Sequence, residues 1–318
     1  MKGSLWLAWR QQRVLVVCGA VVLVAAAALA AYFRSGMLED LHSGVFDHCD
    51  PGPLYCSGPE DGLPRFLDVE PLKLLGALNI ALPVLIGMFW GAPLLGRDRE
   101  LGTHRLVLSQ GVSRAQWFAS RFALAVACTV ALSGALALLF RWWWQPAVNR
   151  SYGVFWYEAT ALTGSGPSTV AAALFGLAAG TLAGLLARRV LSAMAWTLLV
   201  TTVVAVLVQW THRARLLVPP DRYVSSGWQP KPPMGDKWST GRYGLVTASG
   251  GREDVRNCPF PSGGELRRCM TDHGYVARFY EANPAGDYWT IQWTDTALLG
   301  GLALALTAAV VLLLRRRV

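Results

Sequence analysis

A dense group of charged residues between two apolar stretches is the part of the sequence best suited to contact a partner. It begins with Arg97-Asp98-Arg99-Glu100 and continues through Gly102-Thr103-His104-Arg105 to Ser113-Arg114. Glycine tolerates unusual backbone angles, and a threonine hydroxyl can accept a backbone N–H at a helix start, so Gly102 and Thr103 predict a break followed by a new helix. An arginine-rich segment with few acids is typical of the cytoplasmic face of a membrane protein, where it can contact a soluble partner.

Motifs for covalent chemistry or nucleotide binding are absent from the sequence. It contains no G-x-x-x-x-G-K-[ST] phosphate loop, no H-E-x-x-H and no G-x-S-x-G elbow. Few ionisable residues fall inside the apolar stretches, which argues against a proton relay and an ion-coupled carrier. We therefore expect no catalytic residues, no metal and no cofactor in this chain.

The composition indicates a membrane protein with several spans. Of 318 residues, 53% are hydrophobic and only 15% are charged, unlike a soluble globular protein. Stretches of about 20 apolar residues are long enough to cross a bilayer, and six are present, at 14–33, 74–95, 118–140, 169–187, 190–210 and 294–314. We predict an all-α integral membrane fold with six transmembrane helices. The predicted parts are 1–210 (five helices, a short interfacial segment and a cytoplasmic turn at 96–117), a loop region of mixed structure at 211–293, and a last helix with a basic tail at 294–318.

The distribution of charge predicts the orientation. If both termini are cytoplasmic, the segments on that side carry two acidic residues, Asp98 and Glu100, and thirteen basic ones: Lys2, Arg10, Arg13, Arg97, Arg99, Arg105, Arg114, Arg121, Arg188, Arg189 and Arg315 to Arg317. This excess follows the positive-inside rule. The net charge of +9 is then explained by anionic lipid at the inner leaflet rather than by nucleic acid.

The four cysteines outside the apolar stretches then lie on the outer side. Cys49 and Cys56 bracket a short turn, and Cys258 and Cys269 lie in the 211–293 region, which we predict to be an extracytoplasmic cap. His42 and His48 near the first pair leave a metal site as an alternative, but an oxidising exterior favours disulfides. Four cysteines allow three pairings, and the sequence does not choose among them.

Glycines spaced four residues apart predict close helix packing. Gly87 and Gly91 share one face of the second span, and Gly176, Gly180 and Gly184 share a face of the fourth. Both a contact within one subunit and a contact between two subunits fit this pattern.

Three further features each have a structural and a functional interpretation. Pro83 predicts a kink in the second span, which is either purely structural or part of a transport path. The run Trp142-Trp143-Trp144 favours an aromatic belt at the membrane interface over a substrate gate. Asp295, placed at the start of the sixth span, is explained by the helix dipole, with contact to a substrate or an ion as the alternative.

The spacing Glu100-x-Gly102-Thr103 followed by Val112-Ser113-Arg114 resembles the membrane subunit of a type-2 ATP-binding-cassette transporter, of the actinobacterial kind. Blocks at 174–200 and 280–317 match more loosely. Such subunits usually carry two acidic residues flanking an apolar one before the Gly-Thr, and Arg97-Asp98-Arg99-Glu100 departs from that pattern.

The resemblance implies a permease that dimerises with a second copy or a paralogue. A separate ATPase subunit would bind ATP and Mg, and the family favours export of a hydrophobic or amphipathic compound, or antibiotic self-protection. The residues that would couple to the ATPase are Arg97, Arg99, Glu100, Gly102, Thr103, Arg105 and Arg114, with Arg188 and Arg189 as a second, minor contact. The alternative for these residues is a membrane-surface anchor. The alternative for the whole chain is a membrane sensor with a ligand-binding cap.

Overall fold

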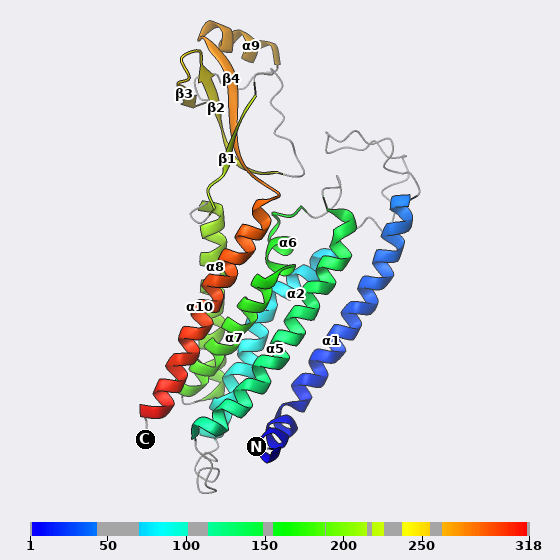
Figure 1. The fold of residues 1–318 in the computed structure, drawn as a ribbon, viewed down its shortest axis with the longest axis vertical. Helices are drawn as coiled ribbons and strands as arrows, with labels where there is room; N and C mark the ends of the chain where they lie inside the picture. The colour runs from blue at the N-terminus through cyan, green and yellow to red at the C-terminus, as the bar shows by residue number, and fades with distance from the viewer. Residues whose placement is uncertain are drawn as a thin grey trace.

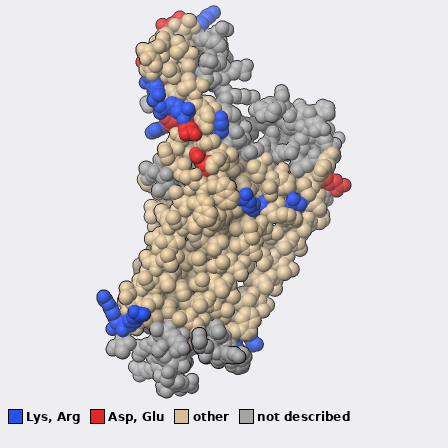
Figure 2. All heavy atoms as spheres, in the orientation of Figure 1, with Lys and Arg blue, Asp and Glu red and all other residues tan. Residues whose placement is uncertain are grey.

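The computed structural model describes residues 2–42, 70–100, 114–148, 155–187, 189–214, 218–225, 237–254 and 263–316. Six helices in these ranges are long and apolar enough to cross a membrane. Figure 1 shows them side by side, with the start of α1 and the end of α10 at one end of the bundle, called the termini end here. A small sheet lies beyond the opposite end, called the sheet end. On the face shown in Figure 2, a broad uncharged band separates charged residues at the two ends, as a bilayer requires.

The six spans are built from eight of the helical segments in the described ranges, because three consecutive segments make up the second span. The helical segments are α1 (Lys2–His42), α2 (Glu70–Ile86), the π-helix η2 (Gly87–Gly91), α3 (Ala92–Glu100), α5 (Arg114–Trp144), the 3-10 segment η3 (Gln145–Ala147), α6 (Ala159–Gly164), α7 (Pro167–Leu186), α8 (Val190–Ala214) and α10 (Asp287–Arg316). The second span consists of α2, η2 and α3 in succession. Pro83 lies inside α2 one turn before η2, and a π-helical turn is a local departure of the kind often found near functional sites.

Both described ends of the predicted turn at 96–117 are helical. Residues up to Glu100 belong to α3, and residues from Arg114 belong to α5. The charged group at 97–100 is therefore the last turn of the second span, because Arg and Glu are good helix formers and carry the helix into water.

The 211–293 region, for which the sequence predicted mixed structure without naming its elements, contains a sheet. Its strands are β1 (Asp221–Ser225), β2 (Lys237–Thr247), β3 (Arg252–Asp254) and β4 (Tyr275–Pro284), all antiparallel in the order β1-β4-β2-β3. Helix α9 (Gly263–Asp272) packs on it through a core of Leu245, Met270 and Tyr275. The region is also shorter than predicted at both ends, because α8 runs to Ala214 and α10 begins at Asp287.

Helix α7 is the centre of the bundle and packs against α2, η2, α3, α5, α8 and α10. Its glycines let the backbones meet. A Cβ added at Gly176, Gly180 or Gly184 would collide with the carbonyl oxygens of Pro83, Gly87 and Ala92 respectively. In the other direction, a Cβ at Gly87 would lie 2.6 Å from the Gly176 oxygen, and one at Gly91 would lie 2.6 Å from the Leu177 oxygen. The structure places all five glycines in one contact within the chain.

Candidate functional site

The residues predicted to couple to a partner lie at the termini end, as far as the structure describes them. Arg97 and Glu100 are exposed in the last turn of α3, and Arg189 is exposed just before α8. Arg99 is in α3 and Arg114 begins α5, but their side chains are outside the described residues, as are Gly102, Thr103, Arg105 and Arg188. The structure thus brings the ends of the second and fourth spans and the starts of the third and fifth spans to one face of the bundle.

Glu100 has a partner within the chain. Its Oε2 accepts a hydrogen bond of 3.0 Å from the backbone N–H of Val190, the first residue of α8. The first N–H groups of a helix lack an intrahelical acceptor, and a carboxylate there also interacts favourably with the helix dipole. Glu100 therefore joins the end of α3 to the start of α8, so that the two predicted contact segments form one surface.

A second tie at this end joins three helices. The side chain of Gln12 is buried; its Oε1 accepts from Trp90 Nε1 at 2.9 Å, and its Nε2 donates to the Arg121 carbonyl at 3.1 Å. Arg121 in turn lies over the ring of Trp117, 4.8 Å from its centroid. Gln12 thus links α1, η2 and α5. No sequence pattern singled it out, because its partners are distant in the chain.

A short helix precedes the fourth span at the sheet end, and side chains from two other helices bond to the backbone at the break between the two. Helix α6 ends at Gly164 and α7 begins at Pro167. Gln292 of α10 donates to the Leu162 carbonyl and accepts from Ser168 N (3.3 Å) and Ser168 Oγ (2.7 Å). Asn79 of α2 donates to the Gly164 carbonyl at 2.7 Å. Unpaired backbone groups are costly where they are buried, so Gln292 and Asn79 make this break between α6 and α7 possible.

Polar contacts continue along α10 beside the break. Tyr288 and Ser165 share a hydrogen bond of 2.8 Å between their hydroxyl oxygens. Asp295 is 2% exposed and lies two turns inside α10, since that helix begins at Asp287. The prediction that the dipole at the helix start explains Asp295 is therefore wrong. It is the only buried carboxyl-bearing residue among the side chains that the structure describes.

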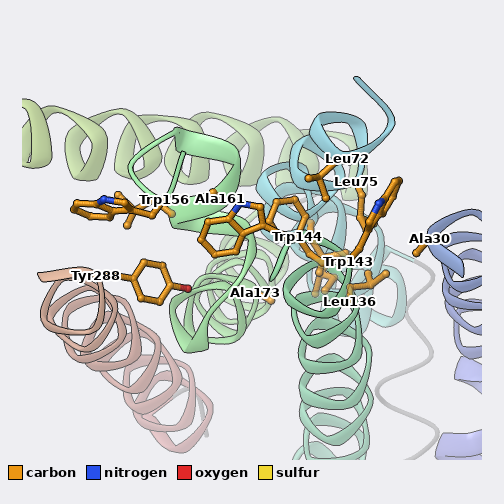
Figure 3. Close-up of a cluster of buried hydrophobic side chains, with 14 of the residues drawn as sticks. Ala30, Leu72, Leu75, Leu136, Trp143, Trp144, Trp156, Ala161, Ala173 and Tyr288 are labelled. Atoms are coloured by element: carbon orange, nitrogen blue, oxygen red, sulfur yellow. The ribbon is translucent and has the colours of Figure 1, made fainter. Parts of the chain in front are cut away.

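Aromatic side chains pack across the sheet end, as Figure 3 shows. Trp143 stacks on Phe33 of α1, and Trp144 lies beside Tyr288 of α10. Both tryptophans are about 95% buried, and only Trp142 is substantially exposed, at 45%. The belt interpretation therefore holds for one of the three, because the end of α5 is enclosed between α1 and α10.

The sheet also rests on this end of the bundle through aromatic contacts. The ring of Trp238, at the start of β2, stacks on Tyr157 and meets Trp156 edge-on. Burial, with a smaller contribution from Glu158, raises the pKa of Tyr157 above its ordinary value.

Of the predicted disulfide cysteines, only Cys269 lies among the described residues. It is disulfide-bonded. The other three, Cys49, Cys56 and Cys258, lie outside the described residues, and so does the partner of Cys269. The pairing therefore stays a prediction. In the described part of the chain no three His, Cys, Asp or Glu side chains gather as metal ligands, and His42 contacts the Leu38 carbonyl at 2.6 Å.

Comparison with known proteins assigns this architecture to a family. A family model described as "ABC-2 membrane transporter related" matches residues 20–213, from α1 through α8. No curated protein and no solved structure matches the chain. The match covers more than half of the chain, favours the permease interpretation over the sensor, and implies an ABC ATPase partner in general. The chain belongs to the ABC-2 membrane transporter related family and is a multi-pass membrane permease of an ABC transporter.

Proposed function

We propose that this chain is the permease subunit of an exporter in the bacterial plasma membrane. It works as a dimer with a second copy or a paralogue, and a separate ATPase subunit binds each permease at the termini end. The ATPase binds ATP and Mg, and this chain supplies the docking surface and the membrane path. The exported compound is hydrophobic or amphipathic, in keeping with the resemblance of the 100–114 segment.

The observation that carries the proposal is the hydrogen bond between Glu100 and Val190 N. It joins the ends of two spans at a surface that also presents the exposed cations Arg97 and Arg189. A partner that binds there acts on α3 and α8 together. Since α3 and α8 both pack against the central helix α7, a force at this surface reaches the core of the bundle directly.

The proposal places the termini end in the cytoplasm and the sheet outside. The supporting observations are the basic residues of the termini end, including Arg315 and Arg316 at the end of α10, and the disulfide at Cys269 in α9. Disulfides persist outside the cytoplasm, and cytoplasmic segments are enriched in Lys and Arg.

Co-purification tests the partner and the docking surface together. The tagged chain is isolated from its native membranes in mild detergent, and the proteins recovered with it are identified by mass spectrometry. We expect an ABC ATPase with the wild type and with Arg252→Ala, a control on the exposed strand β3. We expect less ATPase with the double variant Arg97→Ala/Arg99→Ala, which removes two cations from the proposed surface.

Substitutions of Glu100 separate its bond within the chain from its charge. Glu100→Gln keeps an oxygen that can accept from Val190 N, whereas Glu100→Ala removes it, so loss of the ATPase only with Ala assigns the residue to the α3–α8 joint. Loss with both assigns the carboxylate to the partner. If a folded wild type brings down no ATPase, the two-component proposal is wrong. If all variants retain it, the docking surface lies elsewhere.

A further inference from the structure

We propose that Arg34 and Arg141 bind the headgroup phosphate of an anionic phospholipid at the sheet end of the bundle. The proposal concerns the membrane leaflet at the opposite end from the ATPase surface and does not depend on that surface. Arg34 lies near the end of α1, and Arg141 lies in the last turn of α5. The occupant is a phospholipid such as phosphatidylglycerol, whose acyl chains lie along the exposed apolar faces below.

Each of the two arginines is held against a tryptophan ring of a neighbouring helix. Arg34 Nε donates to the Trp142 carbonyl at 3.0 Å, and its guanidinium lies 4.3 Å from the centroid of the Trp142 ring. The guanidinium of Arg141, the preceding residue, lies 4.8 Å from the centroid of Trp289 in α10. These contacts hold one cation between α1 and α5 and the other between α5 and α10.

Both supporting tryptophans face the surroundings. Trp142 is 45% exposed and Trp289 is 44% exposed. Tryptophan prefers the boundary between acyl chains and headgroups, because its ring is apolar and its N–H is polar. The arginines stacked on these rings therefore lie at the depth of lipid phosphates. Figure 2 shows basic groups at the edge of the uncharged band toward the sheet end.

The charge of this site is not balanced by the described part of the chain. The ion pairs found there are Lys73–Glu70 and Arg222–Glu281, and neither arginine of the site lies at ion-pair distance from a described carboxylate. The carboxyl end of α5 offers about half an elementary negative charge, against two full positive charges. The bond from Arg34 Nε uses one of the five N–H donors of a guanidinium, which leaves donors for a phosphate.

Lipid retention measured by native mass spectrometry tests the proposal. The purified full-length chain is titrated with phosphatidylglycerol or phosphatidylcholine, and binding to the first lipid site is compared among variants. Each interfacial basic residue contributes about fivefold to affinity for anionic lipid, so Arg34→Gln/Arg141→Gln should bind phosphatidylglycerol roughly 30-fold more weakly than the wild type. Lys73→Gln is the matched control, because this lysine at the same end is already paired with Glu70 at 3.1 Å; its phosphatidylglycerol affinity should stay within about twofold of the wild type.

Further arms keep the test decisive. Arg34→Lys/Arg141→Lys retains both charges and should retain most of the phosphatidylglycerol preference. If the glutamine pair does not fold, the single variant Arg141→Gln should show about fivefold weaker binding. Equal affinity of the wild type for phosphatidylglycerol and phosphatidylcholine overturns the proposal, as does unchanged affinity in the glutamine variants. Binding of inorganic phosphate by the wild type with the same affinity as phosphatidylglycerol also overturns the proposal, because the occupant would then not be a lipid.

Discussion

Gln292 offers the sharpest test of how the break between α6 and the fourth span is held. Its side chain is fully buried and makes three hydrogen bonds across the gap between α6 and α7. Gln292→Ala leaves the Leu162 carbonyl and the Ser168 N–H and hydroxyl without this partner. At roughly 0.6–1.5 kcal/mol for each bond, we expect the variant to lose about 2–4 kcal/mol of unfolding free energy.

Gly166 allows this contact to be tested from the opposite side. Its backbone is extended, with φ −139° and ψ −172°, so alanine fits the backbone without strain. However, a Cβ at this position would collide with the Gln292 side-chain amide. Gly166→Ala alone should therefore cost about 1–3 kcal/mol by overpacking. In the Gln292→Ala background the amide is gone, and the same substitution should cost almost nothing.

The coupling between the two substitutions is the quantity to measure. The four chains of the double-mutant cycle are unfolded in mixed micelles by titration with dodecyl sulfate and followed by circular dichroism. We expect the double variant to be at least about 1 kcal/mol more stable than the sum of the single effects predicts. Additive costs would refute the contact between Gly166 and Gln292, and with it the explanation of the break.

Two other predictions concern the packing of the helices and the contact between the sheet and the bundle. Gly180→Ala should destabilise the bundle by about 1–3 kcal/mol in thermal unfolding, because the added Cβ would collide with the backbone of η2. The control is Gly300→Ala, where the added Cβ meets open space, and it should be neutral or slightly stabilising. Equal effects of the two substitutions would contradict the packing of η2 on α7. Burial and, to a smaller extent, Glu158 raise the pKa of Tyr157 above the ordinary value of 10.0. The protonated Tyr157 hydroxyl therefore contributes fully to the stability of the fold below pH 10, and this contribution is lost as the pH rises through the folded-state pKa. The contact with Trp238 should then loosen, seen as a change in tryptophan fluorescence that is absent in Tyr157→Phe.

The six spans could be predicted from hydropathy because each must present apolar side chains over the full thickness of a bilayer. Their ends were placed less well. Helices α8 and α10 continue past the apolar stretches to Ala214 and Asp287, since helix formation does not stop where hydropathy falls. The individual strands of the 211–293 region were not identified for a related reason. Its strands mix charged, aromatic and small residues, and their pairing depends on contacts between β1 and β4 that are distant in sequence.

The polar ties at the two ends of the bundle carry no local sequence signal. Gln292 bonds to residues 124 and 130 positions away, and Gln12 bonds to residues 78 and 109 positions away. A single glutamine near the end of an apolar stretch looks like an ordinary interfacial residue. The glycine spacing was visible because close approach requires a small residue at every turn of the same face. Which helix fills that face depends on the tertiary fold.

The positions of these ties determine how the proposed docking surface can act on the rest of the molecule. Glu100 fixes α3 to the start of α8, backbone contact at the glycines fixes α3 and η2 to α7, and Gln292 fixes α7 to α10. Packed backbones do not slide past one another without losing these contacts, so a force at Glu100 favours rotation of the helices as one body over sliding between them.

Strand β1 follows α8 in the chain, and strand β4 precedes α10. The two strands pair with each other. At the same place Asn283 donates to Asp287 at 2.8 Å and to the Pro219 carbonyl at 3.4 Å. The sheet is therefore attached at the junction of the two helices rather than suspended from a loop. If the proposed docking surface rotates the bundle as one body, we therefore expect the orientation of the sheet to change with it.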